Sequence, residues 1–99
     1  MDTVLFEERV KEIPRLRSCL SSGRVERWPR KQALREMLFD IVVDCMQEGS
    51  TWTEREITQE LAAITADPVT LRRALIDEER LVRSPDGSQY RLASKVASE

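Results

Sequence analysis

The stretch TWTEREITQELAAITADPVTLRRALID, residues 51–77, contains the start signals of two consecutive helices. Thr53, with Glu56 three residues later, has the pattern of a capping box. Asp67 followed by Pro68 has the pattern of a second helix start, with proline at the first helical position. So few residues separate the two predicted helices that we expect them to cross at a steep angle, as in a helix-turn-helix.

The expected helices cover about residues 53–65 and 67–79, and each has an apolar stripe at helical spacing. The expected inward residues are Ile57, Leu61, Ile64, Leu71, Ala74 and Leu75. The outward face of the second helix then carries Thr70 and Arg73, with Arg72 on its flank. This helix therefore presents two neighbouring arginines in different directions.

The segment before this pair predicts a long central helix over about residues 30–47. Its apolar face is so wide that Glu36, Asp40 and Asp44 take up most of what remains. Because no histidine accompanies these carboxylates, we expect a solvated helix face rather than a metal or acid/base site.

The segment after the pair, LVRSPDGSQYRL (residues 81–92), predicts a β-hairpin. Its centre, Pro-Asp-Gly, holds three residues that favour a tight turn. The STW at residues 50–52 is expected to add a third short strand to this hairpin.

The first residues predict a helical extension, with Thr3 as the cap of a first helix. Pro14 interrupts the apolar spacing, and a second helix is expected to start there and to end at Gly23. GRVERWP, residues 23–29, follows as a short extended connector or strand. The expected segments are an N-terminal helical extension (1–22), a core domain (23–92) and a flexible tail (93–99).

The composition predicts one compact domain in the cytoplasm. The 99 residues are 40% apolar and 34% charged, with no apolar run long enough for a membrane and with acids where a secretory signal has bases. Histidine is absent, so we expect no zinc site, no cofactor and no enzymatic activity. Cys19 and Cys45 are expected to be small core residues.

Charge is strongly segregated although the net charge is only -2. Residues 9–35 contain nine bases against two acids, whereas residues 36–79 contain three arginines against eleven acids. Such polarity either presents a basic surface to an anionic partner or lets one copy of the chain face another.

Four segments resemble a family of small bacterial domains catalogued as a domain of unknown function. They are GRVERWPRKQALREMLFDIV, WTEREITQEL, TLRRALIDEERLVR and DGSQYRL, and together they span about residues 23–92. The family pattern includes Pro-x-Lys, Tyr-Thr-Glu-x-Glu, Leu-Arg-Arg and Asp-Gly-Ser-x-Tyr. Trp52 and Thr58 stand here where the family favours tyrosine and asparagine, and Glu79 with Arg80 replaces its glycine-containing turn.

Members of that family resemble winged-helix transcription regulators. The resemblance therefore implies an α+β, mainly α, fold. Its expected form is a winged helix-turn-helix with an N-terminal helical extension and a C-terminal β-hairpin wing.

A winged helix of this kind would bind double-stranded DNA with the helix at 67–79 in the major groove. Thr70 and Arg73 would reach base edges, and Arg72 would reach a phosphate. The other candidate contacts are Arg83, Gln89 and Arg91 on the hairpin and Lys31 in the basic segment before the long helix. We therefore expect a DNA-binding module that regulates transcription.

The same residues allow an alternative, a protein-interaction or dimerisation domain that does not bind DNA. Asp77 lies four residues after Arg73 and is placed to pair with it. Glu78 and Glu79 follow at the end of the same helix, where they would repel phosphate. The bases at 24–35 would then dock on the acidic half of a second copy or on another protein.

Overall fold

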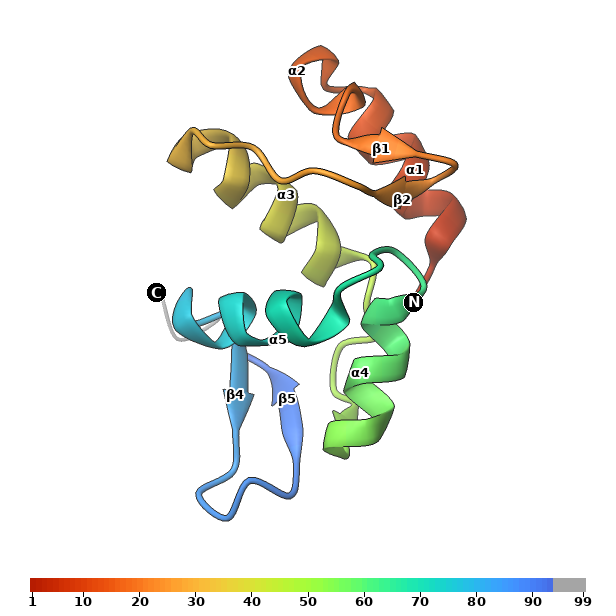
Figure 1. Cartoon of the computed structure of the whole chain (residues 1–99). Coiled ribbons are helices and arrows are strands. Elements are labelled where there is room, and N and C mark those ends of the chain that lie inside the picture. Colours follow the sequence, from red (N-terminus) through yellow and green to blue (C-terminus); the bar gives the residue numbers. More distant parts are fainter. Residues whose placement is uncertain (94–99) are drawn as a thin grey trace.

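The computed structural model describes residues 1–93, and it shows a small α+β fold with two antiparallel sheets (Figure 1). Its helices are α1 (Thr3–Lys11), α2 (Pro14–Arg17), α3 (Gln32–Asp44), α4 (Glu54–Ala62) and α5 (Pro68–Asp77). Its strands are β1 (Leu20–Ser21), β2 (Arg24–Val25), β3 (Thr51–Trp52), β4 (Leu81–Arg83) and β5 (Tyr90–Leu92). The expected α+β class is confirmed.

The helix α3 is central, as its nearly continuous apolar sequence predicts. Its buried residues are Leu38, Phe39, Ile41, Val42 and Val43. The helix begins at Gln32, later than expected, because Lys31 before it is still extended. It ends at Asp44, and Gly49, with a φ of 83°, lies in the loop that leads to β3.

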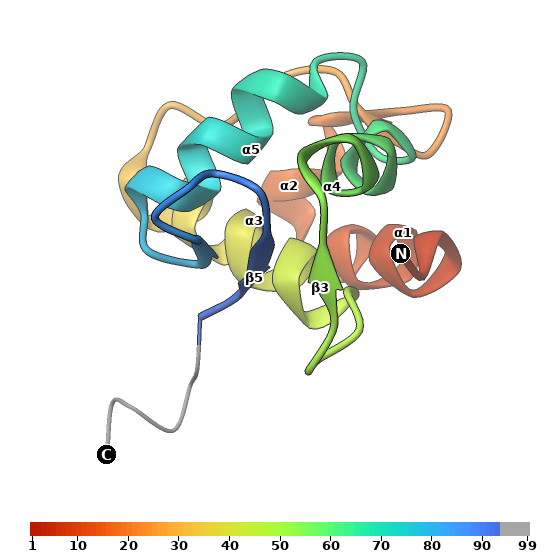
Figure 2. The same cartoon turned by 90° about the horizontal axis from the view of Figure 1, so that it is seen from below.

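Both predicted helix starts of the α4–α5 pair are confirmed. The Thr53 hydroxyl accepts from the Glu56 backbone N–H at 3.1 Å, and the Glu56 carboxylate accepts from the Thr53 N–H at 2.9 Å. Asp67 accepts from the Thr70 N–H at 3.2 Å. Figure 2 shows α4 almost end-on while α5 lies across the view, so the two helices cross steeply.

The sheet beneath α5 has the strand order β3-β5-β4. The predicted hairpin is confirmed as β4 paired with β5, and the predicted third strand is confirmed as β3 on the other side of β5. Tyr90 on the central strand is opposite both Trp52 and Arg83. Because both Tyr90 and Trp52 are buried, this face of the sheet packs on the helices.

The N-terminal region differs from its prediction in two details. Asp2, not Thr3, caps α1, because its carboxylate accepts from the Leu5 N–H at 3.0 Å. The second helix does start at Pro14 but covers only Pro14–Arg17, and the chain then forms the β1–β2 hairpin. Ser22 and Gly23 at its turn have φ values of 55° and 78°, which suit a tight hairpin turn.

The N-terminal helices share one core with the rest of the fold. Phe6, Val10 and Leu16 are buried in the same cluster as the residues of α3, α4 and α5. The Asp2 N–H donates to the Cys45 carbonyl at 3.0 Å, and the Met1 ammonium pairs with Glu60. The extension is therefore packed into the domain rather than appended to it.

Both cysteines are buried and free, as expected of core residues, and burial raises the pKa of both thiols. Ala93 donates its N–H to the Arg80 carbonyl at 3.0 Å, so the first residue of the predicted tail is attached to the sheet end. The remainder of that tail, residues 94–99, lies outside the described residues. None of the helices in residues 1–93 is long and apolar enough to cross a membrane.

Candidate functional site

The outer face of α5 is open to solvent. Leu71 and Leu75 are buried beneath the helix, whereas Thr70, Arg73 and Asp77 are exposed. The predicted orientation of the helix is therefore confirmed, with one of its two arginines directed outward.

Arg73 forms no ion pair within residues 1–93, and the pair with Asp77 that the spacing suggested is not formed. The acidic group that interacts electrostatically with Arg73 is Asp67, at the start of the helix. Hydrogen bonds from the Thr70 hydroxyl, at 2.7 Å, and from the Thr70 N–H lower the pKa of Asp67, and the charge of Arg73 acts in the same direction. The guanidinium of Arg73 is thus available to a partner.

Arg72 is directed the other way and is half-buried. Its Nη1 donates to the Thr58 hydroxyl at 2.9 Å, and its guanidinium carbon lies 5.6 Å from the centroid of the Tyr90 ring. Thr58 in turn donates to the Glu54 carbonyl at 2.7 Å, and the Tyr90 hydroxyl donates to the Glu54 carboxylate at 3.4 Å. Arg72 therefore connects α5 to α4 and β5.

The candidate arginines of the hairpin lie on opposite faces of the sheet. Residues directly opposite each other in antiparallel strands point to the same face. Arg83 is opposite Tyr90, so it lies on the face that packs on the helices, at its exposed end. Arg91 is opposite Thr51 and Val82 and lies on the outer face. The structure therefore places Arg83, and not Arg91, on the face of the sheet that α5 covers.

The hairpin loop is ordered by its own side chains. Asp86 accepts from the hydroxyls of Ser84 and Ser88 at 2.7 and 2.8 Å and from the Ser88 N–H at 3.0 Å. These hydrogen bonds, with that of Ser84 first, lower the pKa of Asp86 to about 2. Gln89 is exposed where the loop enters β5, and its N–H donates to the Ser84 hydroxyl at 3.1 Å.

Lys31 lies apart from these residues. It precedes α3 as the residue at its N-terminal cap. Figure 1 shows that end of α3 on the side of the molecule opposite the tip of the hairpin. Most of the predicted DNA-contact residues therefore lie on α5 or on the neighbouring part of the hairpin. Arg91 lies on the outer face of the sheet, and Lys31 lies at the far end of α3.

Val69 was not among the predicted candidates, although it lies on the same open surface. It is 38% exposed and precedes Arg73 by one helical turn. The same spacing argument that selected Thr70 and Arg73 would have found it, because four residues separate positions on one helix face.

The family model described as "Uncharacterized protein conserved in bacteria (DUF2087)" matches residues 24–92. The chain belongs to the DUF2087 family. No curated protein and no solved structure matches this DUF2087 chain. The resemblance to a bacterial family is therefore confirmed across the two crossing helices and the hairpin.

Within this DUF2087 domain, several residues of the family pattern have structural roles. Thr53 and Glu56 cap α4, Asp86 orders the hairpin loop, and Arg72 contacts Tyr90. Arg73 and Lys31 are exceptions, because their side chains form no hydrogen bond or ion pair within residues 1–93. Of these two, Arg73 is the one on the open face of α5, where it is available for recognition.

Proposed function

We propose that this DUF2087 domain is a winged-helix module that binds double-stranded DNA and regulates transcription in the bacterial cytoplasm. The observation that carries the proposal is the order α3, β3, α4, α5, β4, β5 with the sheet paired β3-β5-β4. A helix-turn-helix followed by a hairpin wing would have this order, and the order therefore supports the proposal. The second helix of the pair, α5, has an open outer face beside that hairpin.

The outer face of α5, from its first turn to Arg73, is the part that enters the major groove in this proposal. Recognition helices contact bases through their N-terminal residues. Val69 and Thr70 lie in the first turn, where Val69 offers an apolar contact to a thymine methyl group, and the unpaired Arg73 lies one turn after Val69. Asp77 is the last residue of the helix, beyond these three positions.

The hairpin and the inner arginine have supporting roles. Arg83 on the face that α5 covers, and the exposed Gln89 at the loop, would contact the neighbouring DNA backbone in this proposal. Arg72 acts as a positioning residue, because it holds α5 against α4 and β5. The proposed contact surface leaves out Arg91 and Lys31, which lie on the outer sheet face and at the far end of α3.

A titration of a fluorescent generic duplex at low salt tests the proposal. We expect binding at about 50 mM salt that weakens steeply as salt is added, because counterions are released from phosphates. Arg73→Ala and Arg83→Ala are expected to weaken binding. Arg91→Ala removes the same charge from the outer sheet face and is the matched control. Absence of binding at about 50 mM salt, or an equal loss in all three variants, would contradict the proposal.

A further inference from the structure

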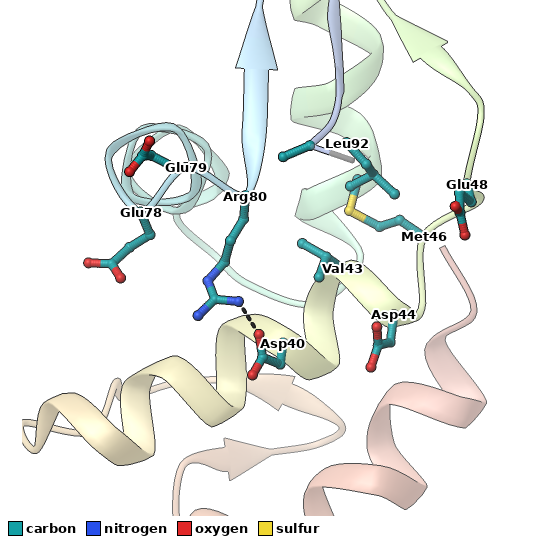
Figure 3. Close-up of a pocket in the computed structure, with 10 residues that line it drawn as sticks. Asp40, Val43, Asp44, Met46, Glu48, Glu78, Glu79, Arg80 and Leu92 are labelled. Carbon is teal, nitrogen blue, oxygen red and sulfur yellow. Dashed lines mark hydrogen bonds and ion pairs between the residues drawn. The ribbon is translucent and has the colours of Figure 1, made fainter. Parts of the chain in front are cut away.

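An acid-rimmed pocket lies on another side of the molecule (Figure 3). Its volume is about 620 Å³, and it is bounded by the C-terminal half of α3, the end of α5 and the end of β5. The apolar lining residues are Val43, Met46, Leu92 and Ala93. The acidic lining residues are Asp40, Asp44, Glu48, Glu78 and Glu79.

The acidic residues that line this pocket outnumber the basic ones. Arg80 is the base among the residues that line it, and Arg80 is already paired with Asp40, as Figure 3 shows. Asp44 pairs with Arg9 at 3.2 Å. The remaining acids at the rim, together with the apolar floor, favour a partner segment that is basic and carries aliphatic stems.

The chain contains such a segment before α3, at residues 27–31. Its bases Arg27, Arg30 and Lys31 are exposed, and they take part in none of the ion pairs of residues 1–93. The segment is also held in a fixed shape. The ring of Trp28 lies 5.5 Å from that of Phe39, and Arg35 donates to the carbonyls of Pro29 and Arg30.

The basic segment and the pocket of one copy lie at opposite ends of α3. That helix has 13 residues and is therefore about 20 Å long. Mutual neutralisation of the two surfaces consequently requires a second copy. Met37 and Asp44 are seven residues apart on α3 and lie on one side of that helix, and Arg30 precedes the helix by two residues. An antiparallel crossing at Met37 brings the basic segment of each copy toward the pocket of the other.

The residue at this crossing point fits a contact. Met37 is 40% exposed and is one of the few large apolar side chains open to solvent in residues 1–93. In a two-fold dimer, both copies use the same contact surface. The basic segment of each copy then faces the pocket of the other, and Met37 of one copy faces Met37 of the other.

We propose that two copies associate through antiparallel α3 helices, with the basic segment 27–31 of each copy in the acid-rimmed pocket of the other. The proposal does not rest on DNA binding, because the pocket is not formed by the open face of α5. It predicts a dimer whose affinity falls with added salt, since its charges are solvent-exposed.

Sedimentation of the full chain over a range of concentrations tests the proposal. We expect a concentration-dependent dimer. Arg30→Glu combined with Lys31→Glu makes the segment acidic, so it would face an acidic pocket. Glu48→Lys combined with Glu78→Lys adds bases to the pocket, so it would face a basic segment. Each double variant is expected to weaken association by on the order of a hundredfold. Mixing the two is expected to restore a dimer, because every opposed charge is then complementary again.

The control is Arg15→Glu combined with Arg55→Glu, which lowers the net charge of the chain as much as Arg30→Glu with Lys31→Glu does, but on α2 and α4. It is expected to dimerise like the unaltered chain. A chain that stays monomeric at high concentration overturns the proposal. An equal loss in the control, or a mixture that stays monomeric, also overturns it.

Discussion

The guanidinium of Arg72 lies over the ring of Tyr90 and simultaneously donates a hydrogen bond to Thr58. Three elements, α4, α5 and β5, meet at this one side chain. Its neighbour Arg73 has the same chemistry and forms no ion pair within residues 1–93. Arg72 therefore stabilises the fold, whereas Arg73 faces solvent. This difference predicts unequal effects of the two substitutions on stability.

Arg72→Ala should reduce the free energy of unfolding by about 1 to 2 kcal/mol, from the loss of a cation–π contact and a hydrogen bond. Arg73→Ala should change it by less than about 0.5 kcal/mol, because the side chain is exposed and unpaired. Urea unfolding followed by tryptophan fluorescence measures both. Equal effects of the two substitutions would contradict the assignment.

Thr53→Ala should destabilise the domain by about 1 kcal/mol, because the first turn of α4 loses its cap. Thr53→Ser keeps the hydroxyl that accepts from the Glu56 N–H and should stay close to the unaltered chain. Thermal unfolding of the three proteins compares them directly. A serine variant as unstable as the alanine variant would show that the methyl group, and not the cap, matters.

Arg24→Ala should destabilise the junction between the β1–β2 hairpin and the α4–α5 connection. Arg24 donates to the carbonyls of Ala62 and Thr65, each at 2.9 Å. Loss of these charge-assisted bonds is expected to cost about 1 to 2 kcal/mol in urea unfolding. Arg15→Ala, which removes an exposed arginine of α2 outside the segment 27–31, is the matched control and should have little effect.

The carboxylate of Asp86 should make the stability of the folded chain fall at low pH. Its pKa is about 2 in the folded chain, below the ordinary value of 3.8. A lowered folded pKa contributes stability that is complete above the unfolded value and is lost as pH falls from about 4 towards about 2. Melting temperatures measured across this range should therefore fall less steeply for Asp86→Asn than for the unaltered chain.

The exposed Asp77 provides the comparison for that measurement. It takes part in no ion pair within residues 1–93. Asp77→Asn removes the same charge without removing the hydrogen bonds of the hairpin loop, so it is the matched control for the slope of the acid limb. If both asparagine variants flatten it equally, the hydrogen bonds of the hairpin loop are not its source.

Helix starts and tight turns were predictable because their signals are local. Thr53 with Glu56, and Asp67 with Pro68, each lie within four residues and specify their caps without help from the rest of the chain. The β1–β2 hairpin was missed because Ser22–Gly23 is a weaker turn signal than Asn-Gly, and because Pro14 suggested a longer helix.

The candidate site was predictable in part for the same reason. Helical spacing placed Arg73 outward, but the partners of Arg72 lie much farther along the chain, at Thr58 and Tyr90. No local pattern indicates such contacts. Arg91 was grouped with Arg83 as a hairpin contact, although strand alternation beside a buried Tyr90 turns Arg91 to the outer face.

The first helix has a consequence for how the domain is handled. Phe6 and Val10 fill a part of the core that residues 24–92 alone would leave open to water, although the family match covers only those residues. A fragment cut to the family boundaries would expose the apolar side of α3 and be prone to aggregate. The region of family likeness is therefore smaller than the cooperative folding unit.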